Sequence, residues 1–194
     1  MKRHSLFTLL YLMVLALTLL STRTLLRLTP APSRVNASVQ TGCLSSHDGY
    51  LRARMQRASA QDAQDAPLDI DWTDAQMECD GDPRPQHRGI RLTFAGHLPG
   101  TGARMRLVFG IAAPPNTPSV RNVPANVTVI FEDERKLYST AGDGKCTIDE
   151  LTAREARYVA RGFCTGPATV LTGSDTLLVE RFDFAGFVRD EDAQ

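Results

Sequence analysis

The stretch "KCTIDELTAREARYVARGFC", residues 145–164, decides the fold, because it fits either two strands or a helix. A turn near residue 155 would place Cys146 and Cys164 nine residues away on either side. Facing positions on neighbouring antiparallel strands lie within the ~7 Å that a disulfide allows between Cα atoms. The sequence therefore predicts a hairpin closed by a Cys146–Cys164 disulfide.

The competing interpretation of this stretch is a helix over residues 147–158, the best helical candidate in the exported part of the chain. Thr147 and Glu150 have the spacing of a capping box, in which the two side chains satisfy each other's backbone N–H groups. We expect the hairpin, because only the hairpin brings the two cysteines together.

Alternation of apolar and polar residues recurs through the rest of the sequence. Leu68, Ile70 and Trp72 alternate with Asp69 and Asp71, which predicts a strand with one buried face. Comparable runs occupy residues 49–57, 89–96, 104–111, 126–132, 157–164 and 176–184. Turn-forming glycine, proline, aspartate and asparagine residues separate these runs. The pattern predicts a mainly β fold, an antiparallel β-sandwich or a partly open barrel.

The second predicted disulfide is Cys43–Cys79. If residues 49–57 pair with residues 68–78, the hairpin is centred near residue 61, and each cysteine lies 18 residues from that centre. Residues 49–57 also fit a short helix, because Leu51 and Met55 have helical spacing. Strand or helix therefore stays open for residues 49–58.

The N-terminus has the features of a membrane segment. Lys2 and Arg3 precede residues 5–22, which carry no charge. These 18 residues would span about 27 Å as a helix, close to the ~30 Å hydrocarbon core of a bilayer. We therefore expect a membrane anchor or signal peptide over 1–27, a linker over 28–42, and an antiparallel β domain over 43–190.

Cleavage after the apolar segment stays open. Leu20 fits badly at the −3 position of a cleavage site after Thr22, and Pro32 disfavours cleavage after Ala31. The favoured location is the bacterial inner membrane, with a single N-terminal span and a periplasmic domain. The alternative is a periplasmic or secreted chain after cleavage. The 19 arginines against 3 lysines suggest a GC-rich bacterial genome.

Composition limits the classes of partner that the chain is expected to bind. Hydrophobic residues make up 42% of the chain, which is enough for a buried core. Without the four basic residues that flank the apolar segment, 18 basic residues face 22 acidic ones, a net charge of −4. A mildly acidic domain is a poor partner for phosphate backbones, so no nucleic-acid partner is expected. No cofactor motif occurs.

The sequence contains few candidate ligand-binding residues. Four side chains are weak ligand candidates: His47, His97, Trp72 and Tyr138. Four carboxylates are weak metal candidates: Asp80, Asp82, Asp143 and Glu150. The loop that contains the last two lacks acidic residues at the first and third positions of a calcium-binding EF-hand loop.

These observations predict a non-enzymatic binding or structural module, displayed in the periplasm, with an envelope protein as partner. One alternative is an envelope hydrolase built on loop histidines and carboxylates. Another is a carbohydrate or small-ligand binder, which would need Trp72 or Tyr138 exposed beside polar loops.

Overall fold

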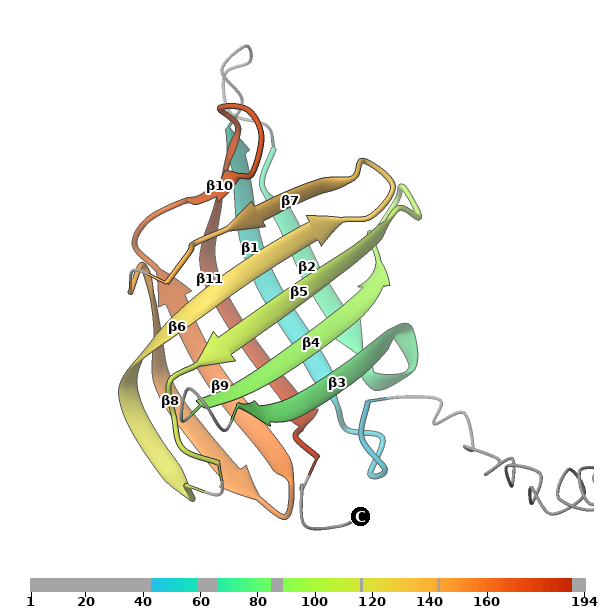
Figure 1. Cartoon of the computed structure of the whole chain (residues 1–194). Coiled ribbons are helices and arrows are strands. Elements are labelled where there is room, and N and C mark those ends of the chain that lie inside the picture. Colours follow the sequence, from blue (N-terminus) through green and yellow to red (C-terminus); the bar gives the residue numbers. More distant parts are fainter. Residues whose placement is uncertain (1–42, 59–65, 85–88, 116, 143, 190–194) are drawn as a thin grey trace, which may run out of the picture. The chain divides into compact units, whose positions relative to one another are not determined.

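In the computed structural model, the described residues form mainly antiparallel strands (Figure 1). The described residues are 43–58, 66–84, 89–115, 117–142 and 144–189, all within one unit that runs from Gln40 to Gln194. The strands are β1 (Tyr50–Ala58), β2 (Leu68–Thr73), β3 (Met77–Arg84), β4 (Gly89–His97), β5 (Arg104–Ile111), β6 (Ser119–Phe131), β7 (Lys136–Ser139), β8 (Cys146–Arg154), β9 (Arg157–Cys164), β10 (Ala168–Val170) and β11 (Thr176–Phe187). A single 3₁₀ turn, η1 (Asp74–Gln76), joins β2 to β3.

Alternation of apolar and polar residues produces these strands. In β5, Met105, Leu107, Phe109 and Ile111 are buried, and the residues between them are half-buried. Side chains on a strand point alternately to its two faces, so one face of β5 packs on the core. The mainly antiparallel β fold predicted from the sequence is confirmed.

Two long strands organise the sheet. The first half of β6 pairs with β8, and its second half pairs with β5 and β7. In the same way, β11 pairs with β1 and β9, and briefly with β10. These pairings make one continuous sheet of 11 strands. It folds over on itself, so that β2-β1-β11-β9-β8 forms one layer and β3-β4-β5-β6-β7 the other, and the β6–β8 and β10 pairings join the two layers. Figure 1 shows β3, β4, β5 and β6 crossing in front of β1, β11 and β9.

The core between the two layers is an aromatic cluster. Phe109 of β5 lies 4.8 Å from both Phe182 and Phe184 of β11, measured between ring centroids. Phe94 of β4 lies 5.1 Å from Phe184. All four rings are at most 2% exposed, so the two layers pack against each other through this buried aromatic cluster.

The hairpin between β8 and β9 forms as predicted. Cys146 lies directly opposite Cys164, and their disulfide has a Cα–Cα distance of 3.9 Å. The competing interpretation of residues 147–158 as a helix is wrong. Glu155 and Ala156, with φ of 50° and 64°, form a tight turn, and β8 gains a second neighbour in β6. Pairing on both sides satisfies its backbone, which local helical propensity does not reveal.

The second disulfide, Cys43–Cys79, is also confirmed, with a Cα–Cα distance of 4.8 Å. Residues 50–58 form strand β1 and pair with β2, which settles the choice between strand and helix. The expected strand over 68–78 does not exist as one piece, however. It ends at Thr73, and η1 turns the chain into β3, so Cys79 lies on a strand that pairs with β4.

A buried carboxylate holds this corner together. Asp74 is 4% exposed, and its Oδ1 accepts hydrogen bonds from the backbone N–H groups of Cys43, Leu44 and Gly49 at 3.0, 2.8 and 3.2 Å. The chain entering at Cys43 is thereby attached to the turn that leads into β3.

The described residues contain no helix that is long and apolar enough to cross a membrane. The predicted anchor over 1–27 and linker over 28–42 lie outside those residues.

Candidate binding face

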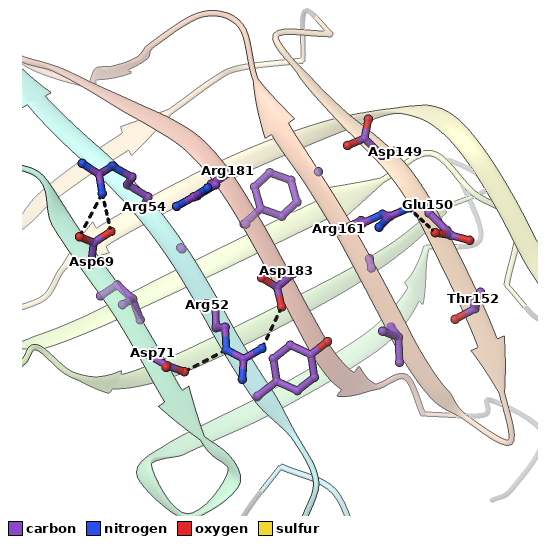
Figure 2. Close-up of a pocket in the computed structure, with 17 residues that line it drawn as sticks. Arg52, Arg54, Asp69, Asp71, Asp149, Glu150, Thr152, Arg161, Arg181 and Asp183 are labelled. Atoms are coloured by element: carbon purple, nitrogen blue, oxygen red, sulfur yellow. Dashed lines mark hydrogen bonds and ion pairs between the residues drawn. The ribbon is translucent and has the colours of Figure 1, made fainter.

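The outer face of the layer β2-β1-β11-β9-β8 holds a hollow with a volume of about 860 Å³ (Figure 2). Its floor is the sheet itself, and its charged side chains are the outward residues of each strand. The arginines are Arg52, Arg54, Arg161 and Arg181, and the carboxylates are Asp69, Asp71, Asp149, Glu150 and Asp183.

Six of the outward residues form what we call the charged row, which crosses six neighbouring strands in register. In order from β2 through β1, β11, β9 and β8 to β6, the row is Asp71, Arg52, Asp183, Arg161, Glu150 and Arg121. Charge alternates at every step. Opposite charges on facing positions of neighbouring strands attract, and like charges repel.

Four ion pairs lie along the charged row. Arg52 bridges Asp71 at 3.2 Å and Asp183 at 3.6 Å. Glu150 bridges Arg161 at 2.8 Å and Arg121 at 3.3 Å. The row is therefore two ion-paired triplets, and Figure 2 draws no interaction between Asp183 and Arg161, where the triplets meet.

The adjacent row breaks this pattern. Arg54 and Arg181 lie directly opposite each other on β1 and β11. Arg54 has carboxylate partners in Asp69 at 3.3 Å and Glu180 at 3.2 Å. Arg181 is exposed and has no ion-pair partner among the described residues. Its neighbour on β9 is Phe163, which is 36% exposed.

Tyr50 lies at the end of the charged face where β1 begins. Its ring lies beneath the Arg52 guanidinium, with 4.9 Å from the guanidinium carbon to the ring centroid. Burial raises the pKa of the Tyr50 phenol, and the Asp183 carboxylate raises it further. Tyr50 is therefore a neutral phenol at physiological pH.

The outer face of the opposite layer differs in charge. Its central row begins at Asp80 on β3, and the next four positions, which we call the neutral row, are Thr93, Val108, Thr128 and Ser139 on β4, β5, β6 and β7. Charged residues lie in the rows on either side, where Arg91 pairs with Asp82 at 3.0 Å and Arg106 with Glu132 at 2.8 Å.

Neither of the two candidate histidines lines the hollow. His47 is exposed, and its Nδ1 lies 3.6 Å from Oδ2 of Asp74. The hydroxyl of the neighbouring Ser46 donates a hydrogen bond to the Asp48 carboxylate, so Ser46 is not paired with an imidazole. His97 is exposed, with its Nδ1 2.8 Å from the carbonyl oxygen of Gly102.

The two candidate aromatic residues are buried. Trp72 is 2% exposed, and its indole N–H donates to the carbonyl of His97 at 2.9 Å. Tyr138 is fully buried and packs edge-on against Phe131, with 5.9 Å between ring centroids. Burial raises the pKa of the Tyr138 phenol. Neither ring is available as the exposed stacking platform that a carbohydrate binder would need.

Three of the four candidate metal carboxylates form ion pairs with arginines. Asp80 pairs with Arg189, and Asp82 pairs with Arg91. Glu150 is a member of the charged row, and Asp143 lies outside the described residues. The part of the chain that the structure describes contains no group of three potential metal ligands.

Sequence reasoning placed part of this face correctly and missed the rest. Alternation put Arg52, Arg54, Asp69 and Asp71 on the solvent side of their strands, which the structure confirms. It could not join them to Asp183, because β1 and β11 are neighbours although more than 100 residues separate them along the chain.

In comparisons with known proteins, no family model, curated protein or solved structure matches the chain.

Proposed function

We propose that this chain is an exported, non-enzymatic binding module with a β-sandwich domain, held at the bacterial inner membrane by residues 5–22. Its binding surface is the charged face of β2-β1-β11-β9-β8, and its partner is a protein of the envelope.

Export is supported by two independent features. The uncharged segment 5–22 follows Lys2 and Arg3, a charge arrangement that favours a domain outside the cytoplasm. All four cysteines are joined in disulfides, and such bonds persist in oxidising compartments such as the periplasm.

The observation that carries the binding function is the charged row, five of whose six residues line the hollow. Exposed ion pairs contribute only about 0–1 kcal/mol each to stability, so folding alone gives little reason for six alternating charges in register. Ordered charge does supply specificity and orientation when two proteins meet. The width of the face, six strands at ~4.8 Å spacing, suits a protein surface better than a small molecule.

The anchor is tested by N-terminal sequencing of the mature chain. We expect the sequence to begin at residue 1 or 2, which retains the uncharged segment. A mature chain that begins after residue 22 would establish a cleaved signal peptide in place of the anchor.

The binding face is tested on the full chain, extracted from membranes in mild detergent at low salt. We expect a complex larger than one chain, measured by sedimentation velocity. Arg52→Glu should remove this complex, because the substitution places a third carboxylate between Asp71 and Asp183.

The matched control is Arg106→Glu, the same change on the opposite layer, which should leave the complex intact. Thermal unfolding of both variants checks that each remains folded. A wild-type chain that sediments alone, or equal losses from the two substitutions, would contradict the proposed face.

A further inference from the structure

We infer that the partner of the charged face is a second copy of this chain, bound face to face across a twofold axis along the strands, between β11 and β9. This inference rests on the proposed function, since it names the partner of the same face. A twofold interface uses the same patch on both copies, so that patch must be complementary to itself.

The charged row meets this requirement. Rotation about the axis reverses the order of the strands, so β11 faces β9 of the second copy, β1 faces β8, and β2 faces β6. The facing pairs are Asp183 with Arg161, Arg52 with Glu150, and Asp71 with Arg121. Every residue of the row therefore faces the opposite charge. An axis along the row would instead place each charge against itself.

Any row of six alternating charges matches its own reverse, so a second observation is needed. Arg181 and Phe163 are register partners on β11 and β9, and they flank the same axis. The rotation therefore places Arg181, which lacks a described ion-pair partner, over the exposed ring of Phe163 in the second copy. An arginine over a phenyl ring is a favourable cation–π arrangement.

The residues beside the axis have unused bonding capacity. Figure 2 draws no interaction between Asp183 and Arg161, and the Arg161 side chain is 67% exposed. A carboxylate accepts several hydrogen bonds and a guanidinium donates five, so each can keep its present partner and bind another. The hollow provides room for these long side chains.

The geometry of the axis also suits twisted sheets and anchored chains. Rotation about an axis along the strands maps a twisted sheet onto one of the same twist, so the two surfaces follow each other. The same rotation leaves Cys43, where the described chain begins, at the same end of both copies. Two chains anchored in one membrane can therefore pair in this way.

The test uses the full chain in detergent and measures its dissociation constant by sedimentation equilibrium. Asp183→Arg alone and Arg161→Asp alone should each weaken self-association by about 100-fold or more, because each places like charges opposite each other twice. Phe163→Ala should weaken it several-fold. Arg106→Asp on the opposite layer is the control and should leave it unchanged.

Mixing the two charge variants provides the decisive arm. In a mixed dimer, the Asp183→Arg chain presents two guanidinium groups beside the axis and the Arg161→Asp chain presents two carboxylates. We expect the mixture to form a heterodimer with an affinity close to that of the wild type. Damage to folding within each single variant would not be repaired by mixing.

The outcomes separate this inference from the proposed function. A mixture that stays monomeric, or single variants that associate like the wild type, would overturn the inference. A wild-type complex that contains one copy and a different protein, and is lost in Arg52→Glu, would overturn the inference and leave the proposed function standing. A chain without any complex would contradict both.

Discussion

The two outer faces of this domain cover the same aromatic core but carry charge in different places. On one layer the central row is Asp71, Arg52, Asp183, Arg161, Glu150 and Arg121. On the other it is Asp80 followed by the uncharged Thr93, Val108, Thr128 and Ser139. The neutral row shows that four neighbouring central positions of this fold need no charge. The alternation on the charged face therefore calls for a different explanation, and recognition of a partner provides one.

The largest expected effect concerns the core that both faces share. Phe184→Ala removes a fully buried ring in contact with Phe94 and Phe109, and should lower the free energy of unfolding by about 3–5 kcal/mol. Phe163→Ala, the same change on the charged face, should cost less than about 1 kcal/mol because that ring is already 36% exposed. Urea unfolding of the two variants measures both values, and equal costs would contradict the placement of the two rings.

The next effect distinguishes the disulfides, because each supports a different layer. Cys146–Cys164 lies inside the β8–β9 ladder of the charged face, whereas Cys43–Cys79 ties the start of the domain to β3. Replacing either pair by serine should cost about 3 kcal/mol in the chain-entropy model.

Hydrogen exchange should show where each loss acts. Without Cys43–Cys79, the amides of residues 43–49 and of β3 should exchange faster, while β8 and β9 stay protected by their ladder. Without Cys146–Cys164, faster amide exchange should appear at the end of the β8–β9 hairpin where the two cysteines face each other. The same exchange pattern in both variants would show that the two disulfides support the domain as a whole.

A smaller effect compares the ion pairs of the two faces. Arg52→Ala and Arg106→Ala should each change stability by no more than about 1 kcal/mol, since both side chains are at least 40% exposed. Only Arg52→Ala should weaken complex formation. A loss of stability above about 2 kcal/mol in Arg52→Ala would mean that the charged row serves folding, which would remove the main reason for assigning it to binding.

The smallest effect is a pH dependence outside the charged face. Hydrogen bonding from Arg104 lowers the pKa of Glu78, whose side chain is 74% exposed. A lowered pKa in the folded chain means that Glu78 stabilises the fold above the ordinary carboxyl value of about 4.3, and that this contribution disappears as the pH falls through the lowered value.

The measurement is a comparison of Glu78→Gln with wild type between pH 7 and pH 3. The difference in stability should be below about 0.5 kcal/mol at pH 7 and should shrink as the pH falls. A difference that grows on acidification would reverse the assigned direction.

Local patterns in the sequence carry most of the fold. Alternation defines the buried faces of strands such as β5, and the equal spacing of Cys146 and Cys164 about residue 155 identifies their hairpin. The same counting pairs Cys43 with Cys79, although the geometry it assumed is wrong. Thr73, Asp74 and Gln76 form a turn that ends β2, and the buried Asp74 carboxylate, invisible to periodicity, completes that corner.

The candidate site was harder to foresee, because its order arises between distant strands. The outward positions of Arg52 and Asp71 follow from their own hairpin. Their continuation through Asp183 and Arg161 depends on β11 lying between β1 and β9. Trp72 and Tyr138 are only weak ligand candidates by residue type, and alternation places Trp72 on the inward face of its strand. Large aromatic rings are also good core residues, and both rings are buried.

The most direct test of the difference between the two faces is photo-crosslinking in living cells. A photoreactive side chain replaces either Thr152, which is exposed beside the hollow on β8, or Val108, at the centre of the neutral row. We expect a crosslinked adduct of the full chain from position 152 and none from position 108. Equal adducts from both positions, or an adduct from position 108 alone, would contradict the assignment of binding to the charged face.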